Sequence, residues 1–225
     1  SEDEREARLL RSELGVLAAL RPHPNVVQFL GWCEKPLSIV LEFVSGGSVL
    51  DYVRAQGERL SRASARRMLA DAASGMEHLH AHNVLHLDLA ARNLLVQLDG
   101  ARVERCKVTD FGQAKGSEYG AQYAAGRERT FPVRWMPPEA LRTGLLERAT
   151  DVWSFGVVVY EVLSGGRKPY AALDNAQVML GLVQGDLRLT LRTDAAADAA
   201  GDDHDDDVPA VRDAQVADLW SVALQ

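Results

Sequence analysis

One stretch, His86-Leu87-Asp88-Leu89-Ala90-Ala91-Arg92-Asn93, guides the interpretation of the whole chain, and Asp110-Phe111-Gly112 follows seventeen residues after Asn93. An aspartate with an asparagine five positions on, followed by a second aspartate, supplies the groups that magnesium-assisted phosphoryl transfer needs. One carboxylate can orient a hydroxyl, while the carboxamide and the second carboxylate can hold a metal ion that bridges phosphates. The spacing therefore points to phosphoryl-transfer chemistry.

Composition describes a globular chain with one sizeable core, since 47% of the 225 residues are apolar and 25% are charged. The net charge of -7 argues against nucleic acid as a partner. Residues 194–207 carry seven aspartates and no lysine or arginine. Because this run lacks the spaced ligands and turn glycine of a calcium loop, we expect a disordered acidic insertion there.

Compartment and topology are constrained by three features. Two cysteines, Cys33 and Cys106, cannot form a disulfide framework and favour a reducing compartment. Residues 1–6 are charged where a signal peptide would be apolar. The longest apolar stretch, Val152–Leu163, is too short to span a bilayer and contains Glu161. We expect no membrane segment in this chain and a cytoplasmic location, or the cytoplasmic side of a membrane if an upstream segment exists.

Leucines at helical spacing open the chain, because Leu10, Leu14 and Leu17 recur at i, i+4 and i+7, and Glu13 shares their face. Residues 22–25 end this predicted helix. Caps, apolar runs and turn residues predict the remaining elements. These are strands over 26–30 and 37–44, a short helix capped by Ser48, a helix from Ser61 with Leu69, Ala72, Met76 and Leu79 on one stripe, a strand pair over 93–96 and 106–109 around the Asp99-Gly100 turn, a buried helix over 151–161, and an amphipathic stretch over 211–224.

Three further motifs follow in order: Phe-Pro-Val-Arg-Trp-Met-Pro-Pro-Glu at 131–139, Asp-Val-Trp-Ser-Phe-Gly at 151–156, and Pro169-Tyr170. With these, the sequence resembles the protein kinase family, and specifically the protein-tyrosine kinases. The resemblance implies an α+β, two-lobe fold. Residues 1–44 would form a partial small lobe, with helix C and two hinge-side strands, and residues 45–225 a mainly helical large lobe.

The resemblance also implies an activity: transfer of the ATP γ-phosphate to a tyrosine hydroxyl of a protein substrate, with ATP and Mg²⁺. Asp88 would be the catalytic base or hydroxyl-orienting group, Arg92 would support the phosphate, and Asn93 and Asp110 would bind the metal. Ala90 stands where serine/threonine kinases usually place a lysine. The predicted substrate-docking loop is Pro132, Val133, Arg134 and Trp135. Serine/threonine or dual specificity stays open.

The adenine site and the supports of the catalytic loop also follow from the resemblance. Leu41 would be the gatekeeper, the Glu42 carbonyl and Val44 amide would bind adenine, and Leu95 would form the floor. Glu13 would be the helix-C glutamate, and Asp151 would anchor the catalytic loop. His86 is interpreted as a packed structural histidine rather than a general base. It would join Leu17, Phe29 and Phe111 in a stacked apolar column, and Cys106 would be a buried small side chain.

Two departures from the family pattern qualify this interpretation. No G-x-G-x-x-G occurs, and no lysine precedes Glu13, so the chain is expected to begin after the first three strands of the small lobe. A pseudokinase or interaction module without turnover therefore remains an alternative. Leu87 stands where most kinases have an arginine that grips a phosphorylated residue. Tyr119 and Tyr123 are candidate phosphosites or ordinary exposed tyrosines, and we expect activity to depend only weakly on their phosphorylation. The sequence does not indicate the oligomeric state.

Overall fold

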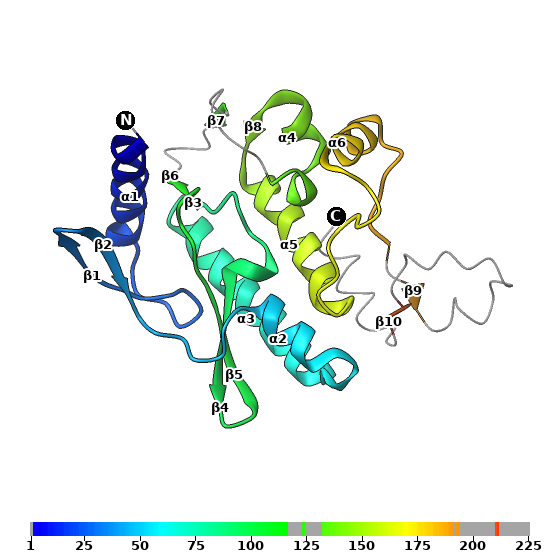
Figure 1. The fold of residues 1–225 in the computed structure, drawn as a ribbon, viewed down its shortest axis with the longest axis horizontal. Coiled ribbons are helices and arrows are strands. Elements are labelled where there is room, and N and C mark those ends of the chain that lie inside the picture. The colour runs from blue at the N-terminus through cyan, green and yellow to red at the C-terminus, as the bar shows by residue number, and fades with distance from the viewer. Residues whose placement is uncertain (1, 117–122, 125–131, 191, 194–209, 212–225) are drawn as a thin grey trace, which may run out of the picture.

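The computed structural model describes residues 2–116, 123–124, 132–190, 192–193 and 210–211. Helix α1 (Glu2–Ala19) stands beside an antiparallel pair of strands, β1 (Phe29–Glu34) and β2 (Leu37–Leu41), at one side of the molecule (Figure 1). The predicted opening helix is confirmed. The predicted acidic insertion at 194–207, and the final amphipathic stretch apart from Val211, lie outside the described residues.

Both predicted strands of this pair had wrong bounds: the strand predicted over 26–30 runs from Phe29 to Glu34, and the strand predicted over 37–44 runs from Leu37 to Leu41. The first begins at Phe29 rather than Val26, because Val26 and Val27 are buried and pair with the backbone of Val108 instead. The Val27 N–H donates to the Val108 carbonyl at 2.9 Å. The second strand ends at Leu41, so residues 42–44 lie outside the ladder.

The rest of the chain is mainly helical, and the α+β class is confirmed. Its helices are α2 (Val49–Gln56), α3 (Arg62–Ala81), α4 (Pro138–Thr143), α5 (Arg148–Leu163) and α6 (Asn175–Gln184), with 3-10 turns at Gly57–Arg59, Ala91–Asn93 and Val133–Trp135. Antiparallel strand pairs are β3 (Val84–Leu85) with β6 (Lys115–Gly116), β4 (Leu94–Asp99) with β5 (Arg102–Val108), and β7 (Tyr123–Ala124) with β8 (Leu145–Leu146). Strands β9 (Arg192–Thr193) and β10 (Ala210–Val211) pair in parallel.

The local signals of the sequence explain where these helices begin. Ser48 accepts a hydrogen bond from the Asp51 N–H at 3.0 Å, and Ser61 accepts one from the Ser64 N–H at 3.0 Å, so both residues cap their helices as predicted. The predicted stripe of α3 is buried. Within the described part of the chain, no helix is long and apolar enough to cross a bilayer.

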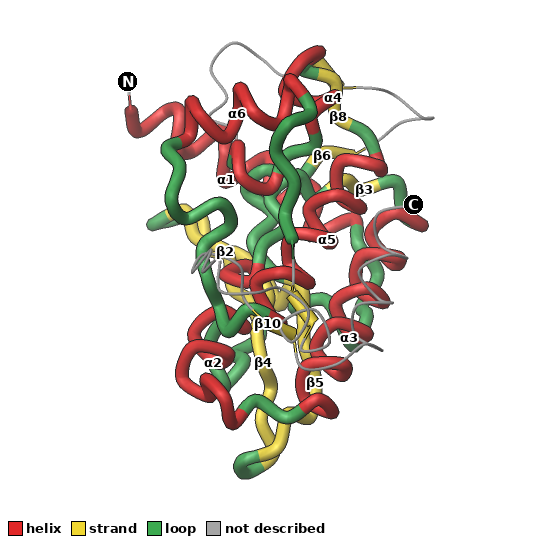
Figure 2. The backbone as a smooth tube through the Cα atoms, turned by 90° about the vertical axis from the view of Figure 1, so that its right-hand side faces the viewer, coloured by secondary structure: helices red, strands yellow, loops and turns green. Residues whose placement is uncertain are grey.

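One core joins α1, α3, the β4–β5 hairpin and α5. In Figures 1 and 2 the hairpin runs to the end of the molecule opposite α4, while α3 and α5 lie between those two ends. The loop after α1 is fastened to this core through buried Asn25. Its amide donates to the Cys106 carbonyl at 3.0 Å, and its carbonyl accepts from the Val108 N–H at 2.9 Å. The position of α1 therefore follows that of β5, the strand that leads to Asp110.

Gly75 allows this loop to lie directly against α3. A Cβ atom at residue 75 would stand 2.4 Å from the Asn25 carbonyl oxygen, a backbone atom that cannot move aside freely. We therefore expect Gly75→Ala to lower the free energy of unfolding by about 1–3 kcal/mol, the usual range for overpacking. Urea-unfolding titrations would measure the change.

Gly15 provides the matched control, because it is an exposed helical glycine at which an added Cβ would meet no atom within 4 Å. Gly15→Ala should raise the free energy of unfolding by about 0.5–1 kcal/mol, since alanine is the better helix former. Equal effects of the two substitutions would contradict this account of the loop.

Candidate active site

The backbone of residues 86–93, the predicted catalytic loop, is fixed by one buried carboxylate. Asp151, at the start of α5, is 1% exposed. Its Oδ2 accepts from the His86 N–H and pairs with His80 Nε2, both at 2.9 Å, and its Oδ1 accepts from the Leu87 N–H at 2.8 Å. Leu87 adopts a φ of 64°, in the left-handed region that leucine rarely occupies. The expected anchoring by Asp151 is therefore present in the structure.

His86 is held as a structural group, in agreement with its interpretation from the sequence. Its Nε2 lies 3.0 Å from the Thr109 carbonyl, and its Nδ1 accepts from the Asp88 N–H at 3.3 Å. These contacts assign the ring proton to Nε2, so neither nitrogen is left for proton transfer. The His86 and Phe111 ring centroids are 5.7 Å apart, and Leu17, Phe111 and Phe29 belong to the same core.

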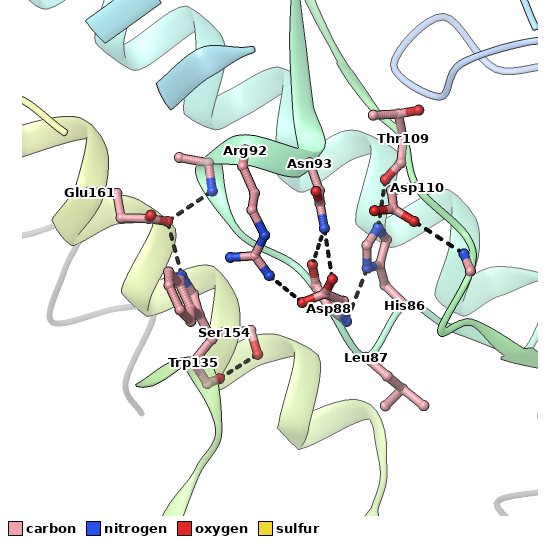
Figure 3. Close-up of polar contacts among 12 residues, drawn as sticks. His86, Leu87, Asp88, Arg92, Asn93, Thr109, Asp110, Trp135, Ser154 and Glu161 are labelled. Atoms are coloured by element: carbon pink, nitrogen blue, oxygen red, sulfur yellow. Dashed lines mark hydrogen bonds and ion pairs between the residues drawn. The ribbon is translucent and has the colours of Figure 1, made fainter. Parts of the chain in front are cut away.

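Two polar side chains, those of Arg92 and Asn93, donate to the Asp88 carboxylate (Figure 3). Arg92 donates to Asp88 Oδ1. The Asn93 amide donates to the Asp88 carbonyl at 2.7 Å and to Oδ2 at 3.1 Å. Burial raises the pKa of Asp88, while Arg92, His86 and Asn93 lower it and Asp110 raises it further. A carboxyl with a raised pKa is better placed to accept a proton near neutral pH than an ordinary aspartate.

A closed chain of contacts joins Asp88 to the predicted docking loop. The Arg92 guanidinium lies 4.6 Å from the centre of the Trp135 ring. The Trp135 Nε1–H donates to Glu161 Oε2 at 3.0 Å, and the same oxygen accepts from the Ala91 N–H at 2.8 Å. Ser154 donates to the Trp135 carbonyl at 2.7 Å. Helix α5 thus positions the catalytic loop and the docking loop together.

Arg134 of the predicted docking loop is buried, and most of its hydrogen bonds go to backbone carbonyls. Its guanidinium donates to the carbonyls of Pro169, Tyr170 and Leu173 at 2.8, 2.7 and 2.6 Å, and to Asn175 Oδ1 at 3.0 Å. Pro132 and Val133 are half-buried beside it. The predicted docking loop is therefore tied to the segment between α5 and α6.

The predicted metal ligands offer hard oxygen donors on the same side of the catalytic loop. Asp110 is exposed, with a φ of 65°, and its Oδ1 accepts from the Gly112 N–H at 3.3 Å. Among the described residues, no group of three or more His, Cys, Asp or Glu could hold a metal alone. Mg²⁺ suits such a site, because it is typically held by one or two protein ligands together with phosphate oxygens and water.

Glu13 reaches the Asp110-Phe111-Gly112 backbone from α1. Its carboxylate accepts a hydrogen bond from the Phe111 N–H, which lowers its pKa, while burial and the nearby Asp110 raise that pKa by more. Three carboxylates, from Glu13, Asp88 and Asp110, therefore share one region of high negative charge. Electrostatics alone make this region receptive to a cation.

The predicted adenine-binding residues lie at the end of β2, in the segment that follows it and on β4. Leu41 and Leu95 are half-buried, and Val44 is buried. The N–H of Val44 and the carbonyl of Glu42 have no hydrogen-bond partner among the described residues. The Glu42 side chain accepts from Lys107 Nζ at 2.6 Å and from the Gln28 N–H at 2.7 Å. This arrangement holds the segment after β2 against the hairpin.

Leu87 joins a small apolar cluster and points away from the Asp88 carboxylate (Figure 3). Its buried partners are Leu85, Met136, Ala140 and Leu146. Tyr123 is described only as a strand residue paired with Leu146, and Tyr119 lies outside the described residues. Position 87 therefore contributes apolar packing and no charge.

Glu161 and Lys107 are the site-supporting residues that sequence reasoning missed. The signal for Glu161 was present, because a lone acid inside an apolar helix needs a polar partner when it is buried. Nothing in the sequence pointed to Lys107, whose partner Glu42 lies 65 positions away. Cys106 is buried, as expected, and burial raises the pKa of its thiol.

Comparison with known proteins gives a consistent set of relatives. A family model described as protein tyrosine and serine/threonine kinase matches residues 1–198. The transforming protein Fps of Fujinami sarcoma virus, a tyrosine-protein kinase, is 40% identical over 72% of this chain and 18% of its own length. The human cytoplasmic tyrosine-protein kinase BMX is 39% identical over 72% of this chain and 24% of its own. The tyrosine-protein kinase SRK2 of Spongilla lacustris is 37% identical over 77% of this chain and 47% of its own. The chain thus spans less than half the length of each of these relatives.

The buried Glu161 carboxyl gives stability a specific pH dependence. Burial raises its pKa above 4.5, so its contribution is fully present below that pH and is lost as pH rises through the folded-state pKa. Glu161→Gln removes the ionisation, yet its amide oxygen can accept both hydrogen bonds that Oε2 now accepts. The free energy of unfolding of the wild type, minus that of Glu161→Gln, should therefore fall as the pH rises above 4.5.

Urea unfolding at a series of pH values measures this difference, with exposed Glu139→Gln as the matched control. A difference that rises with pH would mean that the folded protein stabilises the Glu161 carboxylate instead.

Proposed function

We infer function from family membership: the chain belongs to the protein tyrosine and serine/threonine kinase family, and its fold is a kinase-like α+β fold with a partial small lobe and a mainly helical large lobe. We propose that the chain is the catalytic part of a protein-tyrosine kinase. The proposed reaction moves the γ-phosphate of ATP to a tyrosine hydroxyl of a protein substrate. The lobe boundary is proposed near residue 44, where the chain leaves β2.

The observation that supports this proposal most directly is the geometry at Asp88. The carboxylate is oriented by Asn93 and Arg92, and its raised pKa suits proton acceptance. In the proposed reaction the tyrosine oxygen bonds to the γ-phosphorus, the bond from that phosphorus to the β–γ bridging oxygen breaks, the phenolic proton passes to Asp88, and ADP leaves. Mg²⁺, held by Asp110 and Asn93, would offset phosphate charge. Arg92 would support the transferred group.

ATP is proposed to bind between the segment after β2 and strand β4. The unpaired Glu42 carbonyl and Val44 N–H are the kind of backbone groups that an adenine edge requires. Leu41 and Leu95 would supply apolar contacts, and Glu13 would lie at the phosphate end, beside Asp110. The negative charge shared by Glu13, Asp88 and Asp110 favours a metal-bound nucleotide over free anionic phosphate.

Tyrosine specificity is proposed from the docking loop and the relatives. Residues 132–135 are held beside Arg92 by Trp135, and Ala90 leaves no lysine near the acceptor. The relatives at 37–40% identity are named tyrosine-protein kinases. Asp88, Asn93 and Asp110 are all retained, which favours an enzyme over an interaction module. We propose a cytoplasmic location, as the name of the BMX relative states for that protein.

The decisive variant is Asp88→Asn, which keeps the shape of the side chain and removes the base. Phosphate transfer to a tyrosine peptide, in the presence of ATP and Mg²⁺, should fall by about 10²–10⁴-fold, the usual contribution of a general base. The matched control is Asp99→Asn at the exposed turn between β4 and β5, which should retain the wild-type rate. Unchanged transfer by Asp88→Asn, or transfer to serine peptides but not to tyrosine peptides, would contradict the proposal.

The apolar packing of Leu87 supports the expectation that kinase activity depends only weakly on phosphorylation of Tyr123 or Tyr119. Because Leu87 contacts Met136 and Leu146 rather than offering a charge, a phosphate gains no anchor from position 87. Tyr123→Phe and Tyr119→Phe should each change the rate of peptide phosphorylation by less than about twofold. Rates would be compared before and after phosphatase treatment, with Tyr52→Phe as the control. A large gain on phosphorylation that Tyr123→Phe abolishes would refute this expectation.

A further inference from the structure

A cavity lies between α2, α5 and the segments that flank α6. Its volume is about 430 Å³. Figure 1 shows α2 beside the end of α5 where the chain turns toward α6. The lining residues are Arg54, Tyr160, 166–168, 170–173 and 187–190.

The rim of this cavity is cationic. Arg54, Arg167, Lys168 and Arg188 line it, and no aspartate or glutamate is among the lining residues. All four side chains are exposed, and none forms an ion pair with a carboxylate in the described part of the chain. Among the described residues these cations form a patch of positive charge in a chain of net charge -7, although Arg54 also lies near the Glu161 carboxyl and lowers its pKa.

Two tyrosine rings form part of the cavity lining. Tyr160 is buried, and burial raises the pKa of Tyr170 to about 12, so the Tyr170 phenol remains neutral. Leu173 and Leu187 complete this surface. The Arg54 Nε–H donates to the Gly166 carbonyl at 3.0 Å, and a Cβ at residue 166 would lie 2.6 Å from Arg54 Cγ. Gly166, with a φ of 80°, thus lets the Arg54 side chain lie flat over the loop.

The same loop joins this cavity to the acceptor side of the active site. Arg134 of the docking loop holds the carbonyls of Pro169, Tyr170 and Leu173. Tyr170 and Leu173 also line the cavity. A polypeptide that passes over residues 132–135 would therefore find the cationic rim on the next segment of the protein surface.

We propose that this cavity is a docking site for an acidic segment of the protein substrate, separate from the site that holds the acceptor tyrosine. Carboxylate side chains of the segment contact Arg167, Lys168 and Arg188, and an apolar side chain between them packs on the two tyrosine rings. A peptide suits the site better than an anionic membrane, because the cationic residues surround a recess lined by Tyr160, Tyr170, Leu173 and Leu187, and the chain as a whole is acidic. The proposal rests on the proposed function for its substrate, but the cavity itself can be tested by binding alone.

The first test is binding of a labelled, tyrosine-free peptide of alternating glutamate and leucine, followed by fluorescence anisotropy. The full chain should bind it. The Arg167→Glu, Lys168→Glu double variant should bind about tenfold more weakly, and added salt should weaken binding to the wild type. Arg66→Glu, on the exposed face of α3, is the matched control and should bind like the wild type. Equal loss in Arg66→Glu, or binding to anionic vesicles without peptide binding, would overturn the proposal.

The second test separates this proposal from the proposed function. A tyrosine peptide with an acidic, leucine-containing extension is compared with the same peptide carrying glutamines in place of the glutamates. The wild type should favour the acidic peptide in kcat/KM, and the double variant should lose about tenfold of that preference. If both peptides are phosphorylated with no preference, the docking site is refuted and the kinase function stands. If neither peptide is phosphorylated while the binding difference persists, the kinase function fails and the docking site stands.

Discussion

The buried Asp151 carboxylate is the constraint on which the site depends. Two consecutive backbone N–H groups, of His86 and Leu87, point at it, and a buried N–H group without an acceptor would destabilise the fold by about 1–3 kcal/mol. Accepting both bonds fixes the direction of the chain just before Asp88. Ser154 and Glu161 fall on the same face of α5 as Asp151, and they position the docking loop and the end of the catalytic loop. A helix that is otherwise apolar thus orients every element around the proposed acceptor.

The molecule has one region of negative charge and one region of positive charge. One region holds three carboxylates, those of Glu13, Asp88 and Asp110. Burial raises the pKa of Glu13 and of Asp88, and the nearby Asp110 raises both pKa values further. The Arg134 guanidinium donates to backbone carbonyls of the segment between α5 and α6. The same segment carries part of the cationic rim. A metal-bound nucleotide suits the first region and an acidic peptide suits the second.

The sequence predicted the elements and residues whose signals are local. Helix caps at Ser48 and Ser61, the buried face of α3 and the turn after β4 all depend on neighbours a few positions away, and each was confirmed. The predicted start of β1 was wrong, because Val26 and Val27 pair with Val108, a partner about eighty positions distant, and the predicted strand over 37–44 ended three residues too late. The Lys107–Glu42 pair and the contact of Arg54 with Gly166 were invisible for the same reason, since only the folded chain brings these residues together. The roles assigned to Asp88, Asn93 and Asp110 came from motif resemblance, and their geometry is compatible with those roles.

Amide hydrogen exchange at His86 and Leu87 tests the central claim most directly. If Asp151 holds these two N–H groups, they should exchange only through global unfolding, as slowly as the amides in the middle of α5. The contradicting result is exchange of His86 and Leu87 at the rate of exposed loop amides, in a chain whose α5 amides remain protected. The Asp151 carboxylate would then not be the group that fixes the catalytic loop.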